Sequence, residues 1–357
     1  MAISRGLERQ AEDSIRFGAD LYVAGTQFGR DVPVPVVAAA EIKKFDGVTD
    51  VVPRITGNIT LGKDREPVIV LGLPLETLPP STTCIQGRLY RATSVNELVV
   101  GTELARRLNL TVGSLIPPFY RNERGERVSK VVGIFRSDVS LWQSRLVFTS
   151  FEAAADIFDQ QGLATHLLVY IRPGYEASVR TEIIRMNLAG SESAKILRLR
   201  VTSPDDLRSL LSIGLLHRGG IFNLHFLLMF IVGILVVLVT SGLGLAERRR
   251  EIGVLKATGW QTDEILLRGL VESLLLSVAG AAISTLLAFA WLRGINGFWI
   301  AGIFLAGVDV VPSFSVPFRL TVVPVLVCFL ISLLIVLSGT LWSAWRAATV
   351  SPVEAMR

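Results

Sequence analysis

Three long apolar stretches constrain this chain more than any other feature of its sequence. Ile221–Leu243, Leu270–Leu292 and Leu320–Trp345 hold 23, 23 and 26 residues, and Glu272 is the only formal charge among them. A helix needs about 20 mostly apolar residues to cross the core of a bilayer. Helices buried inside soluble proteins are seldom this long and this apolar. The sequence therefore predicts three transmembrane helices.

A fourth apolar run, Ile295–Val308, has only 14 residues and contains three glycines. It is too short to span a bilayer, so it is expected to form a loop that lies against the membrane interface or dips into it.

Charge divides the chain into two parts. Residues 1–219 hold 27 Lys/Arg and 24 Asp/Glu, whereas residues 220–357 hold 9 and 7. The net charge of +5 is spread over both parts. Without a dense basic stripe, a nucleic-acid partner is not expected. The sequence thus predicts a soluble domain over 1–219, followed by a membrane domain over 220–357.

The predicted soluble domain mixes strands and helices. Alternating apolar residues between turn signals predict strands at 20–23, 51–61, 68–73, 98–100, 131–135, 146–148 and 167–171. Helical patterns occupy 36–45, 102–108, 151–158 and 175–187. The predicted fold class is an α+β domain of two subdomains, the second inserted at about residues 75–165, followed by an all-α membrane domain of three helices. Pro204 is expected to begin the helix that leads to the first span.

Basic residues around the spans predict the orientation. The loop over residues 244–269 carries five Lys/Arg, against two for residues 293–319 and two after the last span. Basic residues concentrate on the cytoplasmic side, which places that loop and the C-terminus in the cytoplasm and residues 1–219 outside. Export needs a hydrophobic signal, and Met1–Asp20 has no apolar core of the required length. A further hydrophobic segment is therefore expected upstream of Met1.

The residues for catalysis or metal binding are sparse. The three histidines, His166, His217 and His225, have no partner at metal-ligand spacing. Phosphate-binding and nucleophile-elbow motifs are absent from the sequence. The two cysteines, Cys84 and Cys328, are too few for a cysteine metal site. A non-catalytic protein without a cofactor or metal is expected, with His166 as a hydrogen-bonded structural residue.

The segment between the first two spans is longer than a simple connector. Over residues 246–268, apolar residues such as Ile252 and Leu255 recur at helical spacing behind a dense charged turn, Glu247–Glu251, and Gly253 and Gly259 interrupt the pattern. Such a helix lies on lipid or fills a groove on a partner. The mixed charge favours a partner. A plain basic anchor explains the arginines but not the apolar face.

The second span contains small residues at every fourth position: Ser273, Ser277, Ala281 and Thr285. Such a stripe lets membrane helices approach closely. Chance in a helix rich in Ala and Ser is the alternative.

Glu247–Trp260, with the sequence ERRREIGVLKATGW, resembles the signature that follows the second transmembrane helix of FtsX-type ABC transporter permeases, a group that includes macrolide-exporter and lipoprotein-releasing permeases. The ending Ala344–Ala348 and Ser351–Arg357 resembles the family's C-terminal pattern. Asn96–Gly101, Leu104-Ala105 and Val112–Ser114 are similar to its extracytoplasmic domain. The resemblance implies four transmembrane helices. The three predicted here would correspond to the last three, and the first is expected in the segment upstream of Met1.

The resemblance implies a permease subunit in a bacterial cytoplasmic membrane that couples ATP hydrolysis by a separate cytosolic ATPase to movements of its extracytoplasmic domain. Export, efflux or extraction of a lipoprotein, lipid or peptide would be its role. The implied partners are that ATPase, a second permease copy in a homodimer or related heterodimer, a periplasmic adaptor protein and membrane lipid. The implied coupling residues are Glu247, Arg248, Glu251, Ile252, Gly253, Leu255, Lys256, Gly259 and Trp260.

Two other functions remain open from the sequence. A permease of this type can regulate a cell-wall hydrolase without moving cargo. From a different class of protein, a membrane-anchored sensor or scaffold would use its outer domain to bind a ligand and its loop to bind a signalling partner.

Overall fold

The computed structural model describes residues 2–16, 18–62, 66–122, 125–186, 188–189, 196–243, 245–297, 316, 318 and 321–348. The chain forms two compact units. One comprises Leu7–Ser212 with Leu305–Pro317 and is called the α/β unit below. The other comprises Met1–Gly6, Ile213–Phe304 and Phe318–Arg357 and is called the helical unit.

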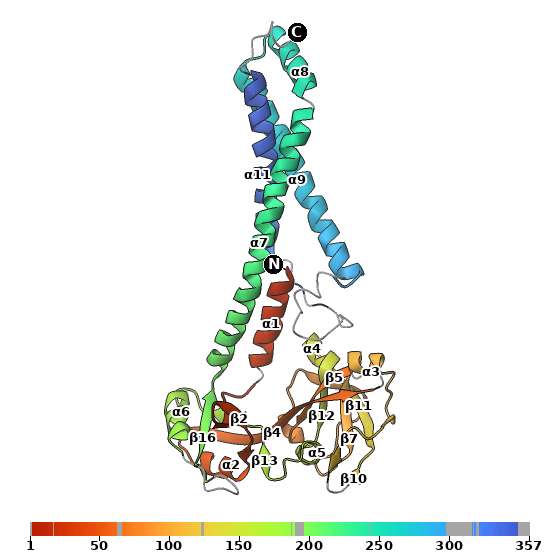
Figure 1. Cartoon of the computed structure of the whole chain (residues 1–357), viewed down its shortest axis with the longest axis vertical. Helices are drawn as coiled ribbons and strands as arrows, with labels where there is room; N and C mark the ends of the chain where they lie inside the picture. Colours follow the sequence, from red (N-terminus) through yellow and green to blue (C-terminus); the bar gives the residue numbers. More distant parts are fainter. Residues whose placement is uncertain are drawn as a thin grey trace. The chain divides into compact units, whose positions relative to one another are not determined.

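A mixed sheet organises the α/β unit (Figure 1). The sheet order is β15-β16-β1-β14-β4-β5-β12-β7-β11-β6, with β2 beside β1 and β8 beside β11. The sheet strands are β1 (Leu21–Gln27), β2 (Arg30–Val32), β4 (Val48–Leu61), β5 (Glu66–Gly72), β6 (Thr82–Gly87), β7 (Glu97–Gly101), β8 (Leu115–Ile116), β11 (Ser129–Ser137), β12 (Leu146–Thr149), β14 (His166–Ile171), β15 (Leu188–Ala189) and β16 (Ile196–Thr202). Two small pairs lie apart, β3 (Val34–Pro35) with β13 (Leu163–Ala164) and β9 (Arg121–Asn122) with β10 (Gly125–Glu126).

Short helices complete the unit: α1 (Ala2–Arg16), which begins in the helical unit, α2 (Val37–Ile42), α3 (Thr102–Arg107), α4 (Ser140–Arg145), α5 (Phe151–Ile157), α6 (Glu176–Arg185) and the 3₁₀ turn η1 (Leu75–Thr77). All seven predicted strands and four predicted helices have counterparts here, with ends shifted by a few residues. The predicted mixed α/β domain is confirmed.

The long strand β4 belongs to both halves of the sheet, as Figure 1 shows. Its first part, Val48–Arg54, pairs with β14, and its second part, Ile55–Leu61, pairs with β5. The inserted subdomain at about residues 75–165 stays a prediction. The second half of the sheet also draws on β4 and β5, which precede residue 75.

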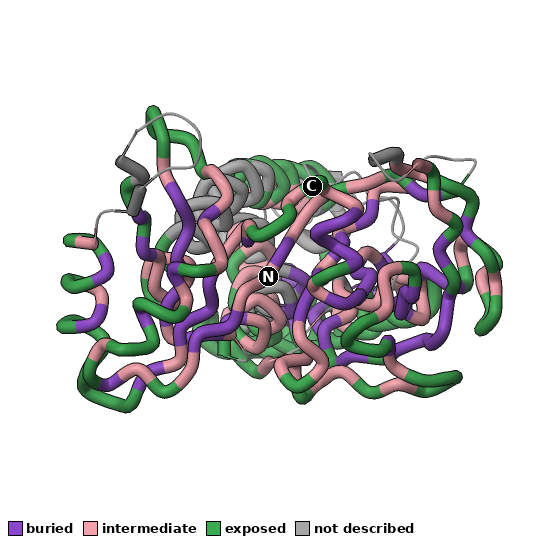
Figure 2. Tube along the Cα trace, turned by 90° about the horizontal axis from the view of Figure 1, so that it is seen from below, coloured by how far each residue is buried: buried purple, intermediate pink, exposed green. Residues whose placement is uncertain are grey.

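Separate apolar cores form on the two halves of the sheet. In the first half, α2 and α6 each bury two residues one helical turn apart against the strands: Ala38 and Ile42, and Val179 and Ile183. In the second half, the buried strands β7 and β12 contribute Leu98, Val100 and Val147. Figure 2 shows buried segments in the interior and exposed segments at the outer turns of the chain. Strands that are covered on both faces typically have continuous apolar sequences. Burial on both faces therefore explains the continuous apolar sequences of β7 and β12.

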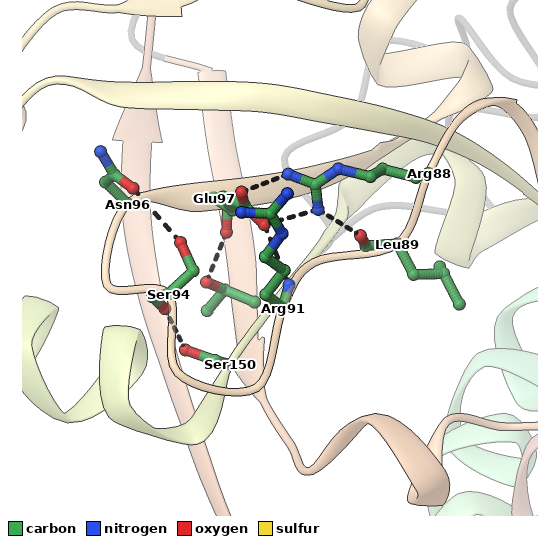
Figure 3. A network of polar contacts seen from close by, with 8 residues as sticks. Arg88, Leu89, Arg91, Ser94, Asn96, Glu97 and Ser150 are labelled. Carbon is green, nitrogen blue, oxygen red and sulfur yellow. Dashed lines mark hydrogen bonds and ion pairs between the residues drawn. The ribbon is translucent and has the colours of Figure 1, made fainter.

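Glu97 anchors the loop that precedes β7 (Figure 3). Its carboxylate accepts hydrogen bonds from the Arg88 guanidinium, one at 2.8 Å, and from the Arg91 backbone N–H at 2.9 Å. The hydrogen bond from Arg88 holds the pKa of Glu97 below its usual value. At the last residue of the strand, a Cβ on Gly101 would lie 2.2 Å from the carbonyl oxygen of Gln143. The Asn96–Gly101 motif therefore serves the fold.

Four helices are described in the helical region: α7 (Pro204–Leu243), α8 (Leu245–Ala257), α9 (Thr262–Gly294) and α11 (Val322–Ala348). The prediction that Pro204 begins a helix is confirmed. Ser203 and Asp206 cap this helix reciprocally, since each side chain accepts a hydrogen bond from the other residue's backbone N–H, at 3.2 and 2.9 Å.

Among the described residues, α9 is the one helix that is both long and apolar enough to cross a bilayer. Within α7 and α11 the apolar stretches are shorter, Phe226–Thr240 and Val325–Ser338. The prediction of a helical C-terminal part is confirmed, and the number of three membrane crossings stays a prediction. Most of the expected loop at Ile295–Val308 and the C-terminal motif over 349–357 lie outside the described residues.

The structure corrects the interpretation of His166. The Nδ1 atom of His166 is buried and has no hydrogen-bond partner in the described part of the chain. Burial and, next, the nearby charge of Arg54 lower the pKa of His166 from its ordinary 6.5 to about 4. His166 is therefore neutral in the folded protein, with an unused polar atom, rather than the satisfied structural histidine that was expected.

This shift predicts a pH dependence of stability. The unfolded chain protonates His166 near pH 6.5 and the folded chain only near pH 4. Stability is therefore lost as pH falls from about 6.5 to about 4, by roughly 1–3 kcal/mol. Thermal unfolding of the native chain and of His166→Gln at pH 7, 5.5 and 4.5 tests this. The variant should lose less stability than the native chain, and equal losses would contradict the prediction.

Candidate functional site

Helices α8 and α9 form a hairpin with a well-defined turn. The backbone N–H of Gly259 donates to the carbonyl of Lys256, and that of Trp260 donates to the carbonyl of Leu255, both at 3.1 Å. Gly259 has φ +97°. This pattern is a Schellman motif, which uses a left-handed glycine to satisfy the last carbonyls of a helix. Gly259 is thus explained by the turn, in addition to its predicted place in the coupling segment.

The second helix of the hairpin starts with its own cap. The Gln261 backbone N–H donates to Glu264 at 2.9 Å, and the two residues form a reciprocal capping box at the start of α9. Both helix ends are therefore fixed by local hydrogen bonds, so that the turn does not depend on a partner for its shape.

Apolar contacts hold the two helices of the hairpin together. Ile252 on α8 and Ile265 on α9 are 8% and 5% exposed and form one cluster, with the half-buried Leu255 beside them. Gly253 is also buried. The side chain of Ile252 therefore lies inside the hairpin, where it has little surface left for an ATPase.

The outer surface of the hairpin combines charged and apolar side chains. Glu251, Val254 and Trp260 are exposed, and Lys256 is half-buried. An open depression of about 370 Å³ is lined by Arg250, Glu251, Val254, Leu255 and Arg268. The side chains of Glu247 and Arg248 lie outside the described set. Val254 was not among the predicted site residues, although it lies four positions after Arg250, on the same helix face.

The small residues of α9 lie where this helix packs against α11. Ser273, Ser277 and Ala281 are buried and Thr285 is half-buried. The Ser332 hydroxyl of α11 donates to the backbone carbonyl of Ser277 at 3.3 Å.

The polar groups of this stripe are bonded within their own helix. The hydroxyls of Ser273, Ser277 and Thr285 each donate to the carbonyl four residues earlier, at 2.7 Å. This back-bonding satisfies each hydroxyl, so that the helix presents a smooth surface of small groups to its neighbour.

No group of three or more His, Cys, Asp and Glu residues in the described part of the chain could hold a metal ion. The described residues of the hairpin present exposed charged and apolar side chains around the open depression.

A family model matches the helical part of the chain. Residues 223–352 match the FtsX family model, described as FtsX-like permease C-terminal. This region is similar to the FtsX-like permease C-terminal domain, which confirms the resemblance stated for Glu247–Trp260. The match includes α8, α9 and α11.

Solved structures give matches of low sequence identity. The periplasmic region of MacB from Actinobacillus actinomycetemcomitans is 14% identical, with a TM-score of 0.38, over 56% of this chain and 95% of that one. The extracellular domain of the ABC-type transporter YknZ from Gram-positive bacteria is 13% identical, with a TM-score of 0.38, over 52% of this chain and 99% of that one. No curated protein sequence matches the chain.

The turn geometry predicts opposite effects at two glycines. A Cβ would meet no neighbour at Gly259 or at Gly269, so only backbone conformation distinguishes the two sites. Gly259→Ala should destabilise the protein by about 1–2 kcal/mol because of its positive φ. Gly269→Ala, inside α9, should stabilise it by about 0.5–1 kcal/mol. Thermal unfolding in detergent measures both, and the same sign at both sites would contradict the turn assignment.

The contact between α9 and α11 predicts that Ser277 does not tolerate a large side chain. Ser277→Leu adds volume at a fully buried position and should cost about 1–3 kcal/mol. Ala282→Leu adds a similar volume at an exposed position of the same helix and should change stability little. Thermal unfolding in detergent compares them. If both variants unfold like the native chain, the packing role is wrong.

Proposed function

We propose that the chain is the permease subunit of an ABC transporter, and that the hairpin of α8 and α9 docks on a cytosolic ATPase. The observation that supports this most is the place of the hairpin within the FtsX-like match over residues 223–352. A coupling element must keep its shape when it is pushed. The two caps and the Ile252–Ile265 contact provide this rigidity.

The proposed docking surface consists of Glu251, Val254, Trp260 and the depression beside Arg268. Interfaces often pair an aromatic or aliphatic anchor with charges that set orientation. In this proposal Val254 and Trp260 supply apolar contacts, and Glu251 and Lys256 supply polar ones. Ile252 and Leu255 contribute chiefly by holding α8 against α9.

Helix α7 supports a mechanical role. It is continuous from Pro204 to Leu243, 40 residues or about 60 Å of helix. It follows directly after β16 and contains the apolar stretch Phe226–Thr240. A stiff element of this kind is what transmission of movement between distant sites requires.

In the full proposal, three helices span the bacterial cytoplasmic membrane, residues 1–219 face outward and the C-terminus is cytoplasmic. Two permease copies would assemble with the ATPase. The cargo would be exported, or extracted from the outer side of the membrane. An adaptor protein and membrane lipid would be further partners. The exposed apolar side chains along α7, α9 and α11 favour a lipid environment for these helices.

Co-purification with the ATPase tests the docking surface. Glu251→Lys combined with Val254→Asp changes two exposed positions of α8, so the fold should survive while ATPase binding weakens at least tenfold. The matched control is Glu182→Lys combined with Ile184→Asp, the same kinds of change at exposed positions of α6. Retention of the ATPase is measured after detergent extraction.

Loss of the ATPase with the α8 pair and retention with the α6 pair would support the proposal. If the native chain binds no ATPase, or if the α8 pair binds as tightly as the native chain, the docking proposal is overturned and a sensor or scaffold role becomes the better hypothesis.

A further inference from the structure

A cavity of about 860 Å³ lies within the α/β unit, apart from the proposed docking hairpin. Its lining comes from strands β1, β4, β14 and β16 and from α1, α6 and the start of α7. The register places Arg54 of β4 directly opposite His166 of β14, and Ala24 of β1 opposite Arg200 of β16. Cross-strand partners project to the same face with their Cβ atoms about 5 Å apart, so one bound group can reach both Arg54 and His166.

Two of the three arginines that line this cavity have carboxylate partners. Arg200 pairs with Asp31, and Arg180 pairs with Asp206 at 3.0 Å. Within each pair the two charges cancel. The net charge of the cavity lining therefore depends on the remaining arginine, Arg54.

Arg54, the third arginine, has no ion-pair partner among the described residues. Its guanidinium lies over the ring of Tyr22, 5.4 Å from the centroid, and its Nε atom is buried without a hydrogen-bond partner among the described residues. Burial lowers its pKa. A stacked ring offers Arg54 some electrostatic stabilisation but no hydrogen-bond acceptor. Charged groups withdrawn from water are normally paired. The described residues supply no anion to Arg54, whose side chain is half-buried.

His166 adds a second unused polar atom at the same place, the buried Nδ1. A neutral imidazole with its proton on Nδ1 donates one hydrogen bond. Around these two residues the lining is partly apolar, with Ile15 of α1 and Leu207 of α7. The volume lies in the range of small-molecule sites, which combine a mostly apolar lining with a few converging polar groups.

We propose that this cavity binds a small amphiphilic ligand through its oxyanion, a phosphate or carboxylate, with Arg54 as the counterion, His166 as a hydrogen-bond donor and the apolar wall around a short hydrocarbon part. Arg forms two parallel hydrogen bonds to such groups. This site does not depend on the ATPase-docking role and would be present in a permease or in a sensor.

The experiment uses the full chain in a neutral maltoside detergent and isothermal titration calorimetry. Hexyl phosphate and hexanoate carry the two oxyanions on the same tail, hexanol carries the tail without charge, and inorganic phosphate carries the charge without a tail. At least one of the two anionic probes should bind the native chain, and hexanol should not.

Arg54→Gln should weaken that binding at least tenfold. The matched control is Arg172→Gln, because Arg172 also stacks on a tyrosine, Tyr175 at 5.1 Å, but is exposed and paired with Asp46. It should bind like the native chain. Ser209→Trp provides a second test that leaves every charge in place. Ser209 is exposed on α7 and lines the cavity, so an indole there should block the entrance and also weaken binding at least tenfold.

If inorganic phosphate binds as tightly as hexyl phosphate, the anion site is supported and its ligand is a free anion. If the tail strengthens binding, a lipid headgroup or another amphiphile is the source. If no anionic probe binds the native chain, if hexanol binds equally well, or if folded Arg54→Gln binds unchanged, the proposal is overturned. Should Arg54→Gln fail to fold, Ser209→Trp decides.

Discussion

The pairing of β4 on both of its parts is the constraint on which the α/β unit depends. Because side chains alternate between the faces of a strand, the register of one strand decides which residues enter each core. Strand β4 pairs with β14 in one half of the sheet and with β5 in the other. Its register therefore determines which residues enter the core in both halves. Arg54 is the last residue that pairs with β14, and the fully buried Ile55 is the first that pairs with β5. The position of the half-buried Arg54 beside the core residue Ile55 follows from this alternation.

The helical unit is held together by different means. Local caps fix the turn between α8 and α9, whereas α9 and α11 meet through small side chains whose hydroxyls are satisfied within their own helix. Neither the caps nor the small-residue contact needs a large apolar core. The helices can therefore keep apolar side chains on their outer surfaces. In water such surfaces would drive association. Within a membrane, packing of small residues is what remains to bring helices together.

The hairpin of α8 and α9 and the cavity of the α/β unit both contain arginines, but the environments of these arginines differ. On α8, Glu251 and Arg250 are exposed. Exposed charges at an interface generally contribute more to the orientation of a partner than to binding energy. In the α/β unit, Arg54 is half-buried with its Nε atom buried, and a charge there is costly until an anion compensates it. A surface charge of the first kind tolerates conservative change. A half-buried cation with a buried, unpaired Nε atom restricts the chemistry of a partner more strongly.

The sequence by itself determined the helical C-terminal part, the main strands and helices of the α/β domain and the resemblance of Glu247–Trp260, because periodicity and motif are local properties. It also placed Ser273, Ser277 and Ala281 on one helix face, since a spacing of four fixes that face. Only the tertiary structure decided that Ile252 is buried against Ile265, that β4 joins two halves of a sheet, and that Arg54 and His166 share a cavity. Arg54 and His166 are more than a hundred positions apart in sequence, and only strand register brings them together.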